Sequence, residues 1–194
     1  MKTTEAITKI PRTGRIGRFA KIVEGKTSQK SFIRILEKSD AYNSYKPDKK
    51  ALWWNSAMER LEQELGTEKA IEVMQSCGSK CCGKGQRQTA KRLMKESTSI
   101  KNFLDKVSHY EVKDDELDYQ LINSNTIIGK HNRCFCGQVK KSNVQFKNTI
   151  YCQCSVAFNK QFFEAAFEMP VDVELTQSIL NGADYCEFKI TINQ

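Results

Sequence analysis

Eight cysteines are the residues of this 194-residue chain whose type and spacing could do chemistry. Cys134 and Cys136 form a Cys-x-Cys pair, and a second pair follows at Cys152 and Cys154. Four thiolates arranged as a tetrahedron make a closed structural zinc site, because thiolate sulfur is a soft and strongly donating ligand. The two pairs therefore predict a zinc site, although the spacing inside each pair is tighter than the usual gap of about two to four residues. Redox-sensitive thiols and small buried side chains stay open as alternatives.

Cys154 suggests a second kind of chemistry. It lies directly before Ser155, the predicted N-cap of a helix, where unpaired N–H groups and the helix dipole favour negative charge. The sequence therefore predicts that the Cys154 thiolate forms more easily than that of a free cysteine, which suits a metal ligand or a catalytic nucleophile. Such a nucleophile usually needs a histidine base, and of the two histidines, His109 and His131, the second is close in sequence to Cys134.

The other cysteines give weaker signals. Cys77, Cys81 and Cys82 lie in a glycine-punctuated segment that is predicted to be a loop after a helix ending at Gly78. We expect Cys82 to be inert, and the sequence assigns no role to Cys77 or Cys81. Cys186 shares one face of a predicted strand with Phe188, Ile190 and Ile192. Core packing and a role as a substitute metal ligand are therefore both open.

The hydrophobic pattern predicts an α+β fold. Helices are predicted at residues 48–66, 67–78, 88–95, 99–107 and 155–168, a strand pair or one long strand at 119–128, a short strand with a turn at 132–140, and strands at 171–180 and 185–192. The expected architecture is an N-terminal helical layer packed on a C-terminal antiparallel sheet with a long helix.

The net charge of +8 is concentrated at the N-terminus, where residues 1–30 carry eight Lys or Arg against two Glu. We therefore expect 1–30 to be a basic, flexible segment, 31–110 a helical subdomain and 111–194 an α+β small-molecule-binding subdomain, the last two forming one compact unit. A basic arm can bind nucleic acid. That function ranks last, because no aromatic residues are interleaved with these charges.

No membrane or export signal is evident in the sequence. No apolar run approaches the roughly 20 residues that span a bilayer, and the N-terminus lacks the apolar stretch of a signal peptide. We expect a cytoplasmic protein without a membrane partner, whose thiols are kept reduced.

The C-terminal half carries a resemblance to a known family. The sequences "YCQCS" at 151–155, "FFE" at 162–164, "VEL" at 173–175 and "SIL" at 178–180, followed by Cys186, resemble an uncharacterised prokaryotic cysteine-containing family. That family is similar to L-2-amino-thiazoline-4-carboxylic acid hydrolase-like proteins and, more distantly, to vinyl-reductase-type small-molecule-binding domains. The resemblance implies a ligand-binding fold of the vinyl-reductase or heme-NO-binding-like type, with a cavity between helices and sheet.

The resemblance also implies candidate site residues. Carried over residue by residue, it places metal ligands at Cys152 or Cys154, Glu174 and Cys186, with Cys134 and Cys136 available for the remaining position. The predicted strand register turns Glu174 to the opposite face. Phe158, Lys160 and Phe162 on the long helix are the expected ligand-pocket residues.

Three functions stay open at this stage. The first is a small-molecule-binding protein whose cysteine cluster binds zinc or stays as redox-sensitive thiols. The second is a hydrolase of a small heterocyclic substrate, with Cys154 as the nucleophile or as a ligand of a water-activating metal. The third is nucleic-acid binding through residues 1–30. The sequence fixes neither the ligand nor the oligomeric state, and a dimer is compatible with it.

Overall fold

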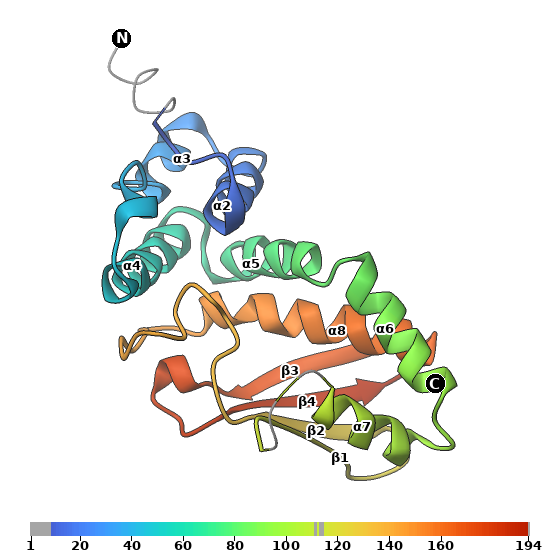
Figure 1. Cartoon of the computed structure of the whole chain (residues 1–194). Coiled ribbons are helices and arrows are strands. Elements are labelled where there is room, and N and C mark those ends of the chain that lie inside the picture. Colours follow the sequence, from blue (N-terminus) through green and yellow to red (C-terminus); the bar gives the residue numbers. More distant parts are fainter. Residues whose placement is uncertain (1–8, 111, 113–114, 194) are drawn as a thin grey trace.

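The computed structural model describes residues 9–110, 112 and 115–193, which form a stack of helices on one sheet (Figure 1). The helices are α2 (Gly14–Glu24), α3 (Gln29–Ile35), α4 (Pro47–Leu65), α5 (Thr67–Cys81), α6 (Lys84–Lys95), α7 (Ile100–His109) and α8 (Gln153–Phe167). The strands are β1 (Leu117–Leu121), β2 (Thr126–His131), β3 (Val171–Gln177) and β4 (Cys186–Ile192), and three short 3-10 helices are η1 (Tyr42–Ser44), η2 (Ile150–Cys152) and η3 (Ile179–Asn181). The predicted α+β class is confirmed.

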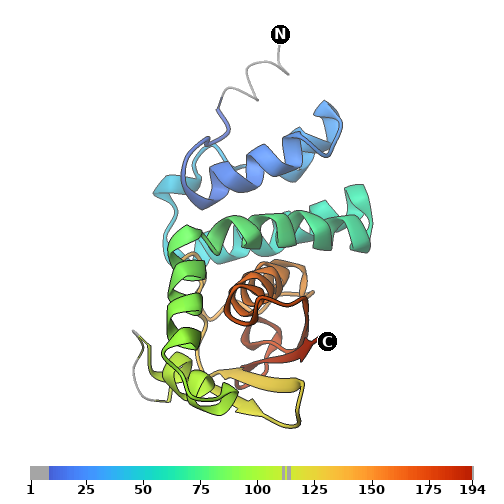
Figure 2. The same cartoon turned by 90° about the vertical axis from the view of Figure 1, so that its right-hand side faces the viewer.

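The elements lie in layers. Helix α8 packs on the sheet, α5 covers the opposite side of α8, and α2 covers α5 in turn (Figure 2). Helix α6 packs against α8 and leads to α7, which packs against β1. Within the described ranges no helix has the combination of length and apolar character needed to cross a bilayer.

The sheet is antiparallel throughout, with the strand order β1-β2-β4-β3. The predicted strand pair near 119–128 is a hairpin of β1 and β2, and β4 pairs with both β2 and β3. Cys186 lies opposite His131, while Glu174 lies opposite Lys189 and is exposed. The short strand expected at 132–140 is wrong. That segment is a loop with no residue in a strand, and its Gln138 accepts a hydrogen bond from Tyr42 of η1.

Helix α2 lies within residues 1–30, for which the sequence predicts a flexible segment. Residues 1–8 of that segment are outside the described residues. Phe19, Ala20 and Val23 are fully buried, because apolar side chains at helical spacing form one face that packs on α5. The described part of this basic segment therefore belongs to the folded core.

The packing has two centres. One contains Trp54, Phe19 and Tyr151 between α2, α4, α5 and the loop before α8, and the other contains Phe163 and Phe188 between α6, α7, α8 and the sheet. Cys152 and Cys154, near the start of α8, belong to the first centre. The division into subdomains 31–110 and 111–194 stays a prediction. Helices α6 and α7 belong to the first range in sequence but pack against α8 and the sheet of the second.

Gly78 allows α5 and α8 to approach each other closely. The sequence predicts that the helix ends at this glycine, whereas α5 continues through it to Cys81. A Cβ atom at position 78 would overlap the carbonyl of Cys154 and lie 2.7 Å from its Cα atom. The glycine is therefore a contact point between two helices, not a helix end, and it brings the end of α5 to the first turn of α8.

This contact predicts a large difference between two glycine substitutions. Gly78→Ala should lower the free energy of unfolding by about 2–4 kcal/mol, because the added methyl group overlaps backbone that cannot move independently. Gly85→Ala on α6 is the matched control, since nothing lies within 4 Å of a Cβ there. The control should be neutral or stabilising by up to about 1 kcal/mol through helix propensity. Urea denaturation of both variants measures the difference, and equal effects would contradict the close approach.

Candidate functional site

The loop of residues 132–149 is anchored on the helical layer. The Tyr42 hydroxyl donates to Gln138 Oε1 at 2.7 Å, and Asn148 Nδ2 donates to Glu62 Oε2 at 3.0 Å. These bonds hold the loop beside α4 and direct the Cys134–Cys136 segment toward the start of α8. There the Cys136 Sγ atom forms a hydrogen bond with the Tyr151 hydroxyl at 2.9 Å.

The second cysteine pair lies at the N-terminus of α8. Cys152 is the N-cap residue and Cys154 belongs to the first turn. The Cys152 Sγ atom forms a hydrogen bond with Ser178 Oγ at 3.1 Å, and the backbone N–H of Ile179 donates to Cys186 Sγ at 3.4 Å. Cys152 and Cys186 thus bond to adjacent residues, Ser178 and Ile179, of the segment between β3 and β4.

Seven cysteines gather around this point and are called the cysteine cluster below. They are Cys77, Cys81, Cys134, Cys136, Cys152, Cys154 and Cys186, all of them free thiols. Cys77, Cys152 and Cys154 are buried in the same packing centre, and Cys134 and Cys136 pack against it. The structure therefore brings the two Cys-x-Cys pairs together and adds the cysteines of α5, whereas Cys82 is fully buried in the core.

Two arginines of α2 donate hydrogen bonds into the cluster. Arg15 Nη2 lies 2.8 Å from Cys154 Sγ, and Arg18 Nη1 lies 3.0 Å from Cys81 Sγ. A guanidinium group has only donors, so both sulfurs act as acceptors. The Arg15 guanidinium also lies 5.5 Å from the centre of the Tyr151 ring, a favourable position for a cation.

Burial controls the acidity of most of these thiols. It raises the pKa of Cys77 to about 12 and that of Cys134 to about 11. The expectation that Cys154 ionises easily is wrong, because burial raises its pKa more than Arg15 and Ser155 lower it. The helix dipole stabilises a charge by only about 0.3–1 kcal/mol. It does not offset the loss of water around a sulfur that is only 6% exposed.

The predicted zinc ligands do not form a metal site in this arrangement. In residues 9–110, 112 and 115–193, no group of three or more His, Cys, Asp or Glu side chains is placed so that it could hold a metal ion. Arg15 donates to Cys154, so a cationic group already occupies the position beside that sulfur. Glu174 is exposed on β3. The assignment of Cys134, Cys136, Cys152 and Cys154 as ligands, with Cys186 as a substitute, stays a prediction.

His131 belongs to a separate buried network. The Tyr119 hydroxyl donates to Asn159 Oδ1 at 3.1 Å and lies 2.8 Å from His131 Nε2. Because the phenol has a single proton, His131 Nε2 carries the ring proton and donates it to the phenol oxygen. Burial lowers the pKa of His131 to about 4, so the ring is neutral. His131 therefore holds Tyr119 in place, and its service as a base for a Cys154-dependent hydrolase stays a prediction without a contact to support it.

The expected pocket residues lie along α8. Phe158 and Phe162 stack with ring centres 6.3 Å apart, and Lys160 Nζ donates to the Val171 carbonyl at 2.8 Å. Lys160 therefore ties α8 to β3. Their role as ligand-pocket residues stays a prediction, since they line neither the cavity between α7 and β1 nor the groove between α2 and α5.

Four residues of the candidate site escaped the sequence analysis. Arg15 and Arg18 were counted only as charges of a flexible arm, although their spacing places both on one face of an amphipathic helix. Cys77 and Cys81 are likewise one helical turn apart on α5. A helix continued through Gly78 would have placed both sulfurs on the same face.

Comparison with known proteins identifies the family. The model of a family described as "Family of unknown function (DUF6144)" matches residues 20–194, and the chain belongs to this family. No curated protein matches, so the expected kinship with thiazoline carboxylate hydrolases stays a prediction.

Two similar solved structures are H-NOX proteins. One is an H-NOX protein from S. oneidensis in the Fe(II)NO ligation state, with 14% identity and a TM-score of 0.48, covering 93% of this chain and 98% of that chain. The other is a mutant of an H-NOX protein from S. oneidensis in the Fe(II) ligation state, with the same identity and score, covering 93% of this chain and 95% of that chain. Similarity at this level says nothing about a ligand of this chain.

The buried His131 predicts a pH-dependent stability. Its pKa is about 4 in the folded chain and about 6.5 when unfolded, so the unfolded state binds the additional proton. The stability from the neutral ring is fully present above about pH 6.5 and is lost as the pH falls through about 4, on the order of 3 kcal/mol. Denaturation at a series of pH values should show this slope in the wild type. The slope should be reduced in His131→Gln and kept in the control His109→Gln, and an unchanged slope in His131→Gln would contradict the assignment.

Proposed function

We propose that the cysteine cluster is a thiol switch in a small-molecule-binding domain, and that a hydroperoxide oxidises Cys81 and Cys154 to a disulfide. The observation that carries this proposal is the pair of hydrogen bonds from α2, in which Arg15 donates to Cys154 and Arg18 to Cys81. A guanidinium group beside a sulfur stabilises the thiolate, which is the nucleophilic form. Residues three apart lie on one helix face, so the two sulfurs lie beside neighbouring guanidinium groups.

Cys81 is the thiol that reacts first. Its side chain is half-buried at the end of α5, where a small oxidant can reach it, whereas Cys154 is 6% exposed and burial raises its pKa. A redox-sensitive cysteine is typically accessible and lies next to a second thiol that completes the disulfide. The contact between Gly78 and Cys154 supports Cys154 as that second thiol, because it brings the backbone of α5 onto that of α8.

The proposed chemistry has two balanced steps. The Cys81 thiolate attacks the terminal OH oxygen of the hydroperoxide, the O–O bond breaks, and the released alkoxide, or hydroxide in the case of hydrogen peroxide, takes up a proton from water and leaves as an alcohol or as water. Cys81 is then a sulfenic acid. The Cys154 sulfur attacks the sulfenic sulfur, forms the S–S bond and expels water, which carries away the Cys154 proton. Two electrons pass from the two thiols to one hydroperoxide.

Zinc is the competing occupant of the same thiols. Zinc at Cys134, Cys136, Cys152 and Cys154 would require Arg15 to leave Cys154, because two cations would otherwise share one sulfur. The present arrangement supports the thiol switch over the zinc site for this reason. Both alternatives involve Cys154, and they differ in their need for Cys81 and Arg18.

Oxidation of the reduced chain tests the proposal. Addition of one equivalent of hydrogen peroxide, followed by alkylation and peptide mass spectrometry, should remove two of the eight free thiols and give a Cys81–Cys154 disulfide. Cys154→Ser should leave a sulfenic acid at Cys81 that dimedone traps. Cys81→Ser should slow thiol loss at least about tenfold, because the remaining thiols of the cluster are more deeply buried or more weakly activated.

Controls separate the switch from general thiol oxidation and from zinc. Cys82→Ala changes the neighbouring cysteine, whose side chain is fully buried, and should leave disulfide formation unchanged. Metal analysis is done on the same preparation. One zinc per chain that is lost in Cys134→Ser but kept in Cys81→Ser, together with a chain that peroxide does not oxidise, would overturn the thiol switch in favour of the zinc site.

A further inference from the structure

A basic groove lies between α2 and α5. Its volume is about 570 Å³, and its charged and polar lining residues are Arg12, Arg18, Lys21, Lys26, Ser76 and Lys80. Three glycines and Ile22 form the rest of the lining, and no acidic residue of the described chain belongs to it. A cavity of this size matches those that hold small ligands, which are about 300–1,000 Å³.

Three of the five positive charges are not compensated by a carboxylate. Arg12 pairs with Glu24 at 2.6 Å, and Lys26 pairs with Glu72 at 3.4 Å. In the part of the chain that the structure describes, Lys21 and Lys80 have no acidic partner, and Arg18 donates to a sulfur instead of a carboxylate. Positive charges that line one cavity attract anions more strongly than the same charges spread over a surface.

We propose that this groove binds a small molecule that carries phosphate groups, with Arg18, Lys21 and Lys80 as its ligands. Arginine and lysine side chains are the usual partners of phosphate oxygens, and three cations suit more than one phosphate charge. A single-stranded nucleic acid fits less well, because such sites stack bases on exposed aromatic rings. Phe19 and Phe32, the phenylalanines of α2 and α3, are both buried in the core.

Arg18 connects the groove to the cysteine cluster. Its side chain lines the groove, and its Nη1 atom donates to Cys81 Sγ at 3.0 Å. A bound phosphate brings negative charge next to this guanidinium and competes for its donors, so the Cys81 thiolate is less stabilised. Occupancy of the groove therefore lowers the reactivity of Cys81. This link rests on the proposed function, whereas phosphate binding itself does not.

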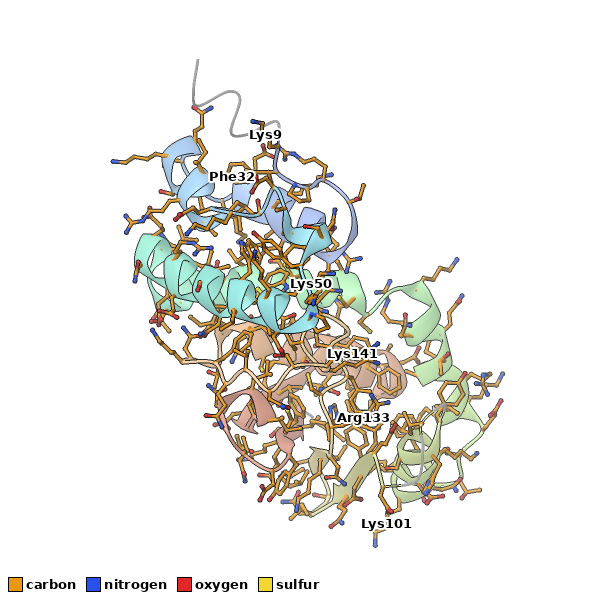
Figure 3. All side chains as sticks on the ribbon, turned by 60° about the vertical axis from the view of Figure 1, so that its left-hand side comes forward. Lys9, Phe32, Lys50, Lys101, Arg133 and Lys141 are labelled. Carbon is orange, nitrogen blue, oxygen red and sulfur yellow. The ribbon has the colours of Figure 1, made fainter. Side chains whose placement is uncertain are left out.

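Calorimetric titration of the full chain with inorganic pyrophosphate tests the site. We expect saturable binding of one pyrophosphate per chain, weakened about fivefold in each of Lys21→Ala and Lys80→Ala. Both lysines are exposed, so their loss leaves the core unchanged. Lys101→Ala is the control, because Lys101 lies on α7 at the far end of the molecule from α2 (Figure 3). Absence of saturable binding, or equal loss in the control, would overturn the proposal.

A second titration with a short single-stranded oligonucleotide decides between ligand classes. The oligonucleotide could bind more tightly than pyrophosphate, with an affinity that falls steeply with salt and depends on Lys21 and Lys80. That result would overturn the small phosphate ligand in favour of nucleic acid. Weaker binding than that of pyrophosphate supports the small ligand.

The alkylation rate of Cys81 by iodoacetamide, a neutral reagent, tests the link through Arg18. Saturating pyrophosphate should slow this rate severalfold in the wild type and have less effect in Lys80→Ala. Binding without protection of Cys81 would overturn the link but not the site. Disulfide formation by peroxide is measured without pyrophosphate. If no disulfide forms, that result overturns the thiol switch and leaves the phosphate site untouched.

Discussion

The contact between the backbones of α5 and α8 at Gly78 and Cys154 is the constraint on which the cluster depends. Only a residue without a side chain allows α5 to lie on the first turn of α8 at this distance. Because α5 is held there, Cys77 and Cys81 reach the sulfurs of the α8 side, and α2, which packs on α5, brings Arg15 to Cys154. The position of the sulfurs is thus set by helix packing, and no metal or disulfide in the described residues is needed to explain it.

Two opposing electrostatic effects meet in the cluster. Loss of water raises the pKa of the buried thiols, whereas the guanidinium groups of α2 favour the thiolate form. Burial also lowers the pKa of Arg15, but Tyr151, Cys154, Cys136 and Cys81 together raise it further, so the guanidinium stays charged. A permanently charged arginine beside neutral thiols can stabilise whichever of them loses its proton. Arg15 therefore provides a fixed positive charge next to Cys154.

The sequence predicted the elements better than their contacts. The α8 helix, the β3–β4 pair and helices α4 to α7 follow from periodicity and caps, because these are local signals, whereas α2 and α3 were not predicted. That cysteines 134–136 and 152–154 act together as one site stays a prediction. The roles of Gly78 and Cys77 were misjudged, because a glycine that ends a helix and one that packs against another helix look alike in sequence. Arg15 was counted only as a charge of a flexible segment. Burial of Cys154 depends on residues far away along the chain, and local rules do not report it.

The cysteine cluster draws on residues from Arg15 to Cys186, almost the full span of the chain. Cys77 and Cys81 are synthesised long before Cys186, so the complete cluster cannot form until the last strand has been made. Their burial is a late event, since contacts between distant segments form slowly. Newly made chains are therefore the population most exposed to mispaired sulfurs, and a reducing environment during synthesis matters more for this protein than for one with scattered cysteines.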